Sequence, residues 1–405
     1  MLQNIFKKFI VFLSIIFSIL LSLEIGLRFI DPPSLSYYRN IKLLHRFHPD
    51  YYVTLGKNID ITIKHYSGLW EGRFTTNSLG FRASDEPNPS SKKIACLGDS
   101  LVMGFGVSDE DTFCNLLNGI EINGEKYQTQ NLAVDAYGSL GSAKRLEESL
   151  TKVDFDTVLF FVSPNDFTVP PGLVEQGVKA DDIVEKAREN DEDYRRKFQI
   201  QFELTRYSYL LQASKLALEQ LAIKRHLANK EVISEWQDAK QPFDYLLSSF
   251  YTFPEPKNCN TSSTDIKSKC PETMPTHIQC EAKIPLATEL DPLPEQTIYA
   301  YNKLLAASKK HGIKLIIVYI PMQNEDIYCN QSKQHSSLYN YVIRSKAFFA
   351  ERGIESIELL EDSRTICPIS DYFIPGDGHL TQKGNLWVKD SLVPKLQKLR
   401  SSSAF

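Results

Sequence analysis

The segment Lys92–Gly104 constrains the fold more than any other part of the chain. It begins as an apolar run of strand length, breaks at Gly98, and continues through Asp99 and Ser100 into an apolar, helix-compatible stretch. A strand that ends in this way places Ser100 at the carboxyl end of a parallel sheet, the edge on which open α/β sheets build their sites. Ser100 would also lie near a helix N-terminus, where unpaired backbone N–H groups favour negative charge.

Strand-like and helix-like segments alternate on both sides of a long interruption. Beyond the strand that leads to Ser100, we expect strands at about 127–133, 157–162, 314–320 and 355–360. Helices are expected at about 110–117, 142–150, 295–310, 338–352 and 382–396. The uninterrupted apolar run at 157–162 is typical of a strand that helices cover on both faces. The alternation predicts an α/β fold, a doubly wound, flavodoxin-like parallel sheet flanked by helices.

We expect four parts along the chain. Residues 1–33 form a cytoplasmic tip and a transmembrane signal anchor, and residues 34–90 form an ordered extracytoplasmic lead-in with short strands. Residues 91–170 and 293–400 form the α/β domain. The insertion at 171–292 is helix-prone in its first part and a Cys-rich loop in its second, and we expect it to form a lid or side subdomain over the sheet edge.

The N-terminus carries an uninterrupted apolar run, Phe9–Leu23, preceded by Lys7 and Lys8. The run is shorter than the roughly 20 residues of a bilayer span, but its apolar character continues beyond Glu24, which can pair with Arg28 on one helix face. A cleaved signal peptide and an uncleaved anchor are the alternatives, and the absence of a small-x-small cleavage site favours the anchor. The lysines predict a cytoplasmic N-terminus and an extracytoplasmic domain, periplasmic or at the cell surface.

The net charge and the cysteine content limit the kinds of partner and metal that we expect the chain to bind. The net charge of −4 and the lack of a basic run give no indication of nucleic-acid binding. Cys96 and Cys114 lie in apolar elements and are expected to be buried thiols. The other five lack C-x-x-C pairs and suitably spaced histidines, so disulfides are preferred to zinc: Cys259, Cys270, Cys280, Cys329 and Cys367. Five is odd, so one is free or pairs elsewhere, and the connectivity stays open.

Three further polar blocks follow strand-like runs, and they supply the parts of an acyl-transfer site. They are the turn 135–138, the block 163–166 that contains Asn165, and Asp377-Gly378-His379. A serine nucleophile needs a base within hydrogen-bond reach, and the base needs a carboxylate that fixes its tautomer. The developing oxyanion needs donors that are held in place beforehand. Each block alone is also an ordinary turn signal, so the prediction depends on their order and on their position after strands.

In these blocks the chain resembles the SGNH (GDSL-type) hydrolase superfamily, in particular its bacterial membrane-anchored members, over about residues 70–400. Gly98-Asp99-Ser100 is similar to the nucleophile block of the family, and Ser163-Pro164-Asn165-Asp166 to its Gly-x-Asn-Asp block. Asp377-Gly378-His379 is similar to the terminal acid–histidine block, and 77–82 to a segment common in anchored members.

The resemblance implies that Ser100 attacks, that His379 Nε2 takes its proton, and that Asp377 orients the imidazole. It implies oxyanion donors at the Ser100 N–H, the Asn165 side chain, and a backbone N–H of the 136–138 turn, at Ala136 or Gly138. It implies structural roles beside the site for Gly98, Asp99 and Asp166. No cofactor and no metal are expected.

The chain departs from the pattern of the family at three places. Ala136 stands where the oxyanion glycine is usual, and Pro164 replaces a flexible position and removes a backbone donor. Asp377 lies two residues before the histidine, where three is more common, which leaves Asp371 as an alternative acid.

These observations predict a membrane-anchored serine esterase or deacetylase that works through an acyl-Ser100 intermediate. Its substrate is a small ester, with an O-acyl group on a cell-envelope glycan as the specific expectation. Two alternatives remain at this point: an O-acetyltransferase to a polysaccharide that uses the same residues, and a non-catalytic SGNH-like scaffold that binds glycan or protein. The sequence leaves the oligomeric state open.

Overall fold

The computed structural model describes residues 2–49, 52–167, 196–228, 290–321, 338–363, 371–375 and 377–402. The chain divides into two compact units. The first contains residues 1–52, 63–69 and 194–262, and the second contains residues 53–62, 70–193 and 263–405. The five cysteines expected to form disulfides, and the Cys-rich half of the insertion, lie outside the described residues.

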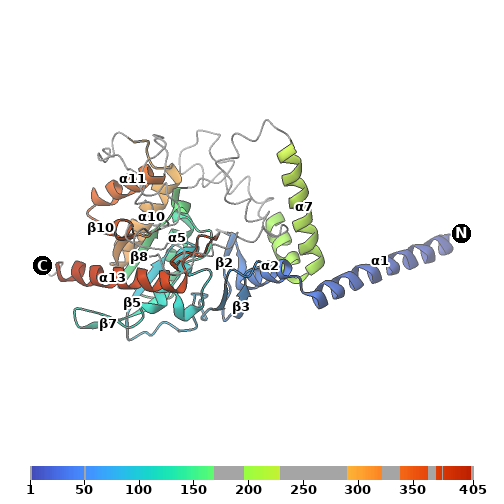
Figure 1. Cartoon of the computed structure of the whole chain (residues 1–405), viewed down its shortest axis with the longest axis horizontal. Coiled ribbons are helices and arrows are strands. Elements are labelled where there is room, and N and C mark those ends of the chain that lie inside the picture. Colours follow the sequence, from blue (N-terminus) through green and yellow to red (C-terminus); the bar gives the residue numbers. More distant parts are fainter. Residues whose placement is uncertain are drawn as a thin grey trace, which may run out of the picture. The chain divides into compact units, whose positions relative to one another are not determined.

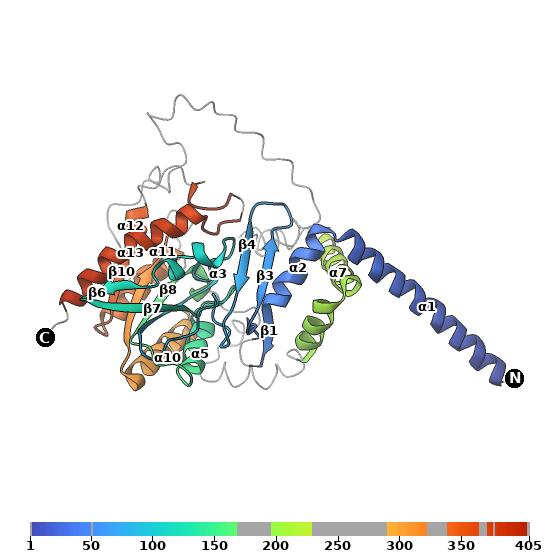
Figure 2. The same cartoon turned by 90° about the horizontal axis from the view of Figure 1, so that it is seen from below.

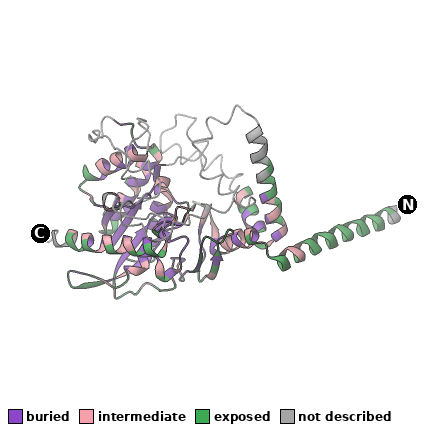
Figure 3. Ribbon diagram, in the orientation of Figure 1, coloured by how far each residue is buried: buried purple, intermediate pink, exposed green. Residues whose placement is uncertain are grey.

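The first unit is mainly helical. Its helices are α1 (Leu2–Ile30), α2 (Pro33–Leu44), a helical stretch at 196–207 and α7 (Tyr209–Ala228). The segment Ile5–Ile30 of α1 is long and apolar enough to cross a membrane, and its side chains are largely exposed (Figure 3). Asp31 takes a positive φ of 45° and the two prolines follow, so α1 ends at Ile30 and α2 begins at Pro33.

The lead-in continues from α2 through four short strands. Their bounds are β1 (His45–His48), β2 (Tyr52–Leu55), β3 (Asp60–Lys64) and β4 (Glu71–Thr75). The expected short strands are therefore present, but a helix precedes them. The described part of the insertion, 196–228, packs against α1 and α2 through a small cluster that contains Leu35, Tyr209 and Leu216.

The second unit contains the predicted sheet. Its strands are β5 (Lys92–Leu97), β6 (Ile120–Ile122), β7 (Glu125–Asn131), β8 (Thr157–Val162), β9 (Lys314–Tyr319) and β10 (Glu355–Glu358). They lie in the order β10-β9-β8-β5-β7-β6. All neighbours are parallel except β6, which runs antiparallel to β7 at the edge. Numbered along the chain, the five parallel strands follow the flavodoxin-like order 2-1-3-4-5, whose switch point lies between β5 and β8.

Helices cover both faces of this sheet (Figures 1 and 2). The bounds are α3 (Ser100–Met103), α4 (Phe113–Leu116), α5 (Ser139–Ser149), α10 (Glu295–His311), α11 (Leu338–Ala350), α12 (Leu360–Ser363) and α13 (Gln382–Ser402), with short 3₁₀ turns η1 (Asp109–Asp111) and η2 (Pro164–Phe167). Helix α5 packs with α10, and α4 packs with α13. Of the two strands at the switch point, β8 has all six residues buried and β5 has every residue after Lys92 buried.

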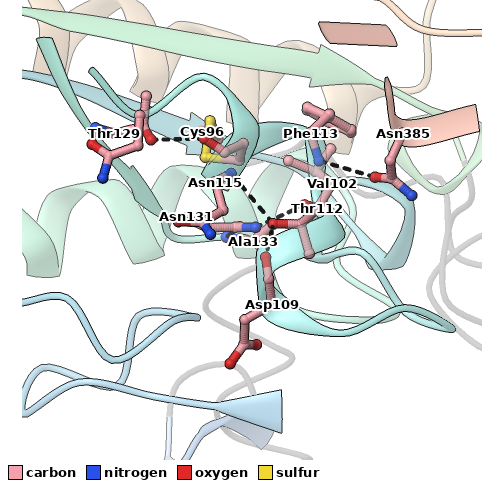
Figure 4. The surroundings of a disulfide bond; sticks show 12 residues. Cys96, Val102, Asp109, Thr112, Phe113, Asn115, Thr129, Asn131, Ala133 and Asn385 are labelled. Carbon is pink, nitrogen blue, oxygen red and sulfur yellow. Dashed lines mark hydrogen bonds between the residues drawn. A yellow bond between two sulfur atoms is a disulfide. The ribbon is translucent and has the colours of Figure 1, made fainter. Parts of the chain in front are cut away.

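Cys96 and Cys114 are not free thiols, contrary to the expectation from sequence. They form a disulfide between β5 and α4, with their Cα atoms 6.4 Å apart (Figure 4). Both residues are buried, as predicted. The chain turns back over β5 after Ser100, however, and brings Cys114 next to Cys96. Thr129 Oγ1 donates to the carbonyl oxygen of Cys114 at 2.7 Å, which ties α4 to β7 as well.

Candidate active site

The nucleophile candidate lies on the turn between β5 and α3. Gly98 is required there, because a Cβ atom at this position would lie 2.4 Å from Val102 Cγ2. Asp99 caps α3, with its Oδ1 accepting from the Leu101 N–H at 3.0 Å. Ser100 is the first residue of α3 and remains partly exposed. The turn therefore presents the hydroxyl group at the carboxyl end of β5, beside the switch point of the sheet.

Three side chains of the predicted site lie in one hydrogen-bonded chain. His379 Nε2 lies 2.8 Å from Ser100 Oγ, although 279 positions of sequence separate the two residues. His379 Nδ1 bonds to Asp377 Oδ1. The Asp377 side chain is 1% exposed, and the His379 side chain is 17% exposed. This is the arrangement in which an imidazole accepts a proton from a hydroxyl while a buried carboxylate fixes its tautomer.

The alternative acid, Asp371, lies elsewhere. Its Oδ2 pairs with Lys383 Nζ at 2.6 Å on the exposed surface. The spacing of two residues between acid and histidine works because Gly378 takes a positive φ of 85°. A left-handed residue between them turns the chain sharply, a conformation that glycine adopts without steric cost.

Two aromatic residues that the sequence analysis did not select support this acid–histidine pair. Trp70 Nε1 donates to Asp377 Oδ2 at 2.9 Å, so both oxygens of that carboxylate have partners. The Phe105 ring lies 5.1 Å from the His379 ring and 4.9 Å from the Trp70 ring, between centroids. No local pattern marks Trp70, because its contact with Asp377 spans 307 positions.

The oxyanion candidates gather beside Ser100. Within the described part of the chain, the backbone N–H groups of Ser100, Ala136 and Gly138 donate to no acceptor. Asn165 Nδ2 donates to Asp99 Oδ2 at 3.0 Å, which holds the amide next to the nucleophile turn. Gly138 packs against Asn165 so closely that a Cβ atom would lie 2.4 Å from its carbonyl oxygen. The turn at 136–138 and the start of η2 are thus fixed to one another.

Ala136 takes a φ of 60°, in the left-handed region. An alanine there is strained relative to glycine, by roughly 1–2 kcal/mol for an L residue in the left-handed conformation. The backbone at this turn therefore has the form that glycine favours, even though alanine occupies it.

Two buried carboxylates flank the nucleophile turn. Burial raises the pKa of Asp99, against the opposing effect of its hydrogen bonds. Burial raises the pKa of Asp166 well above its usual range, and the nearby charge of Asp99 adds to the shift. Asp166 Oδ2 accepts from the Ser163 N–H at 2.7 Å, so this carboxyl group closes the turn after β8. Pro164, which lacks a donor, begins η2 within that closed turn.

Arg82 braces the loop that follows α3. Its guanidinium is buried, bonds to Asp109 Oδ1 at 2.8 Å, and donates to three backbone carbonyl oxygens, those of Met103, Gly104 and Val107. It also lies 3.8 Å from the centroid of the Phe74 ring. The loop held in this way carries Phe105 to His379. The segment 77–82 before the nucleophile strand therefore acts on the site through Arg82.

No group of three or more His, Cys, Asp or Glu side chains gathers into a metal-binding cluster among the described residues. The chemistry that this arrangement can perform is nucleophilic attack by an activated serine, with an amide and backbone N–H groups beside it.

No family model and no curated protein matches the chain. The solved structures that match include a lipolytic protein of the G-D-S-L family from Veillonella parvula, with 11% identity, 75% of this chain and 97% of that chain covered, and a TM-score of 0.34. They also include the psychrotrophic esterase EstA from Pseudoalteromonas sp., with 10% identity, 77% and 100% coverage, and a TM-score of 0.37.

A lipase/acylhydrolase from Enterococcus faecalis matches with 12% identity, 76% and 96% coverage, and a TM-score of 0.35. All three TM-scores lie below 0.5. The sheet has the flavodoxin-like order expected from sequence, with the Gly98-Asp99-Ser100 turn after its first parallel strand and Asn165 after its third. The arrangement resembles the block order of SGNH (GDSL-type) hydrolases, with Asp377-Gly378-His379 as the terminal block.

Proposed function

We propose that this chain is a serine esterase of the SGNH type, held at a membrane by α1 and acting on small acyl esters. The observation that carries the proposal is the 2.8 Å separation of Ser100 Oγ from His379 Nε2, with Nδ1 of the same ring on Asp377. A hydroxyl group becomes a useful nucleophile when a base lies within hydrogen-bond reach and a third group orients that base.

In the acylation step, Ser100 Oγ attacks the ester carbonyl carbon and His379 Nε2 takes the hydroxyl proton. Asp377 stays ionised and stabilises the imidazolium that forms. The carbonyl oxygen becomes an oxyanion, for which the candidate donors are the Ser100 N–H, the N–H of Ala136 or Gly138, and the Asn165 amide. The C–O bond of the ester then breaks, and His379 returns the proton to the departing alkoxide oxygen.

In the deacylation step, water attacks the acyl-Ser100 carbonyl carbon while His379 takes one of its protons. Collapse of the second tetrahedral intermediate releases the carboxylic acid and returns the proton to Ser100 Oγ. Each oxyanion donor of this kind contributes about 3 kcal/mol of transition-state stabilisation in known hydrolases.

We place the catalytic unit outside the cytoplasm. Three features support this location: the apolar span Ile5–Ile30, the lysines before its apolar core, and the Cys96–Cys114 disulfide. Disulfides persist in oxidising compartments and are rare in the cytosol. An O-acyl group on a cell-envelope glycan is the ester that such an enzyme would meet there, and it is our specific proposal for the substrate.

The test uses the full chain in detergent micelles, with p-nitrophenyl acetate as substrate and a fluorophosphonate probe that labels activated serines. Ser100→Ala should abolish both turnover and labelling, whereas Ser84→Ala, at an exposed serine outside the site, should leave both unchanged. Equal turnover by the parent and Ser100→Ala would refute the esterase proposal. If the parent takes up no probe, the scaffold alternative replaces it. If the acyl group moves to an added polysaccharide rather than to water, the enzyme is a transferase.

A further inference from the structure

The first unit carries an apolar stripe that no described residue covers. On α7 the exposed large apolar side chains are Leu211, Leu218 and Leu221, which are 42%, 66% and 53% exposed. They recur at intervals of seven and three residues, so they lie on one side of the helix. The preceding helical stretch exposes Ile200, Leu204 and Tyr207 at intervals of four and three.

The opposite side of α7 is the one that packs against the protein. Tyr209 and Leu216 are buried, and each lies about half a turn around the helix from a member of the exposed stripe. They pack with Leu35 of α2, and Leu27 of α1 lies against the same cluster. The stripe therefore points away from α2.

Hydrogen bonds to Glu24 of α1 fix the first turn of α7. Glu24, near the end of α1, accepts from the N–H groups of Tyr209 and Leu210 at 3.1 and 2.8 Å and from Ser208 Oγ at 2.9 Å. Arg28 bonds back to Glu24 at 2.7 Å. These bonds satisfy donors that the start of a helix leaves unpaired. The N-terminus of α7 is thus attached to the last two turns of the helix that is apolar enough to span a membrane.

Within this unit, α7 turns away from the end of α1, and α2 lies on the side of α7 opposite to that on which α1 leads away (Figures 1 and 2). A helix that is attached crosswise to the end of a membrane span lies along the membrane surface. The face that is turned from α2 then faces the bilayer.

The charges of this region fit an anionic lipid surface. Between residues 196 and 218 the chain has four basic residues and one acidic residue, Glu203. Arg206 pairs with Glu203, so the excess of positive charge comes from Arg196, Lys197 and Lys215. Basic side chains beside an apolar helix face are typical of helices that lie in the bilayer interface. Lysine and arginine can extend their charged ends to the headgroups while their aliphatic stems cover apolar surface.

We propose that the helical region 196–228 lies in the interface of the bilayer that α1 spans, with Leu211, Leu218 and Leu221 inserted among the acyl chains. The first unit is then attached to the membrane at two places, through α1 and through α7. Residues 196–228, the described part of the insertion, are then a membrane-contact element. This inference rests on α1 spanning a membrane and is independent of the esterase proposal.

The test reconstitutes the full chain in phosphatidylcholine–phosphatidylglycerol vesicles, with or without brominated acyl chains. Leu218→Trp and Leu211→Trp each place a fluorophore in the stripe, and Leu386→Trp places one at an exposed leucine of α13 in the second unit. After subtraction of the parent emission, brominated lipid should quench both stripe tryptophans and leave the α13 tryptophan unaffected. The emission of the stripe tryptophans should also lie further to the blue.

Quenching of Leu218→Trp and Leu211→Trp that is no stronger than that of Leu386→Trp would overturn the inference, because protein and not lipid would then cover the stripe. Dilution of the protein in lipid shows whether a second copy of the chain covers the stripe. If quenching appears only when the protein is spread over excess lipid, the stripe is an interface between copies and the inference is also wrong. Esterase turnover is not used as the readout, so failure here leaves the catalytic proposal standing.

Discussion

The indole N–H of Trp70 donates a 2.9 Å hydrogen bond to Oδ2 of Asp377, across 307 positions of sequence. The other oxygen of the same carboxylate accepts from His379. A carboxylate that is held at both oxygens cannot rotate away from the imidazole. Trp70 therefore positions the acid of the proposed triad, and Phe105 packs against both the indole and the histidine ring.

Trp70→Phe should lower kcat about ten-fold or more while leaving KM nearly unchanged. The substitution keeps an aromatic ring and removes only the donor, and a hydrogen bond to a charged group contributes about 1.5–3 kcal/mol, where each 1.4 kcal/mol is a factor of ten in rate. Turnover of p-nitrophenyl acetate over a range of substrate concentrations checks this, because it separates an effect on kcat from an effect on KM.

Trp387→Phe is the matched control, because it makes the same chemical change on α13, away from the site. It should retain both the kcat and the KM of the parent. A Trp70→Phe enzyme with parental kcat would show that the indole N–H has no part in positioning Asp377.

Arg82→Gln should lower the free energy of unfolding by about 3–5 kcal/mol, because it leaves Asp109 buried without its charged partner. Arg73→Gln removes a similar ion pair with Asp60, but there both side chains are about 60% exposed, so the expected loss is much smaller than that at Arg82. Urea denaturation of the two variants measures the difference. Similar losses in both would contradict the bracing role of Arg82.

Replacing both Cys96 and Cys114 by alanine should destabilise the oxidised protein by about 3 kcal/mol, the value expected for a closed loop of this size. The measurement is the denaturant midpoint of parent and variant, each with and without reductant. Reductant should lower the midpoint of the parent more than that of the double variant. Equal shifts would mean that this bond does not stabilise the fold.

Asp166 gives a pH dependence whose sign is fixed. Because burial raises its pKa in the folded protein, the folded state holds this proton at pH values where the unfolded chain has released it. Its contribution to stability is present below the ordinary carboxyl pKa of about 4 and is lost as the pH rises toward the folded value.

Asp166→Asn mimics the protonated form and can still accept from the Ser163 N–H. Relative to the parent, the variant should therefore gain stability steadily as the pH is raised from about 4, by up to about 1.4 kcal/mol per pH unit while the proton is held. Thermal unfolding from pH 4 to 8 checks this. A constant difference between the two proteins across that range would contradict the raised pKa.

The apolar runs were sufficient to predict the central strands β8 and β9, because parallel strands that helices cover on both faces are mostly apolar. The runs at 157–162 and 314–320 are observed as β8 and β9 within one residue at each end. The edge strand β6 was missed, since three residues with one buried side chain carry no period. Helix α2 was missed as well, because its aromatic, polar sequence shows little amphipathic pattern.

At the site, the residues that carry chemistry have local signatures and those that support them do not. Ser100 and Asn165 each follow a strand in a recognisable block, and His379 lies in a recognisable Asp-Gly-His block, so the sequence could indicate all three. Trp70 and Arg82 act through contacts that only the tertiary fold creates. The disulfide was missed for the same reason, because nothing in the spacing of Cys96 and Cys114 shows that α4 returns over β5.

Arg82 and Trp70, which both support the site, lie in the stretch between the helix α2 and the strand β5. A spacer that merely links an anchor to an enzyme can lengthen or shorten in evolution without consequence. This stretch cannot change its length in that way. A displacement of Arg82 would release the loop that follows α3, and a displacement of Trp70 would remove its hydrogen bond to Asp377. Any shortened version prepared for the laboratory must therefore start ahead of the indole and not at the first strand of the sheet.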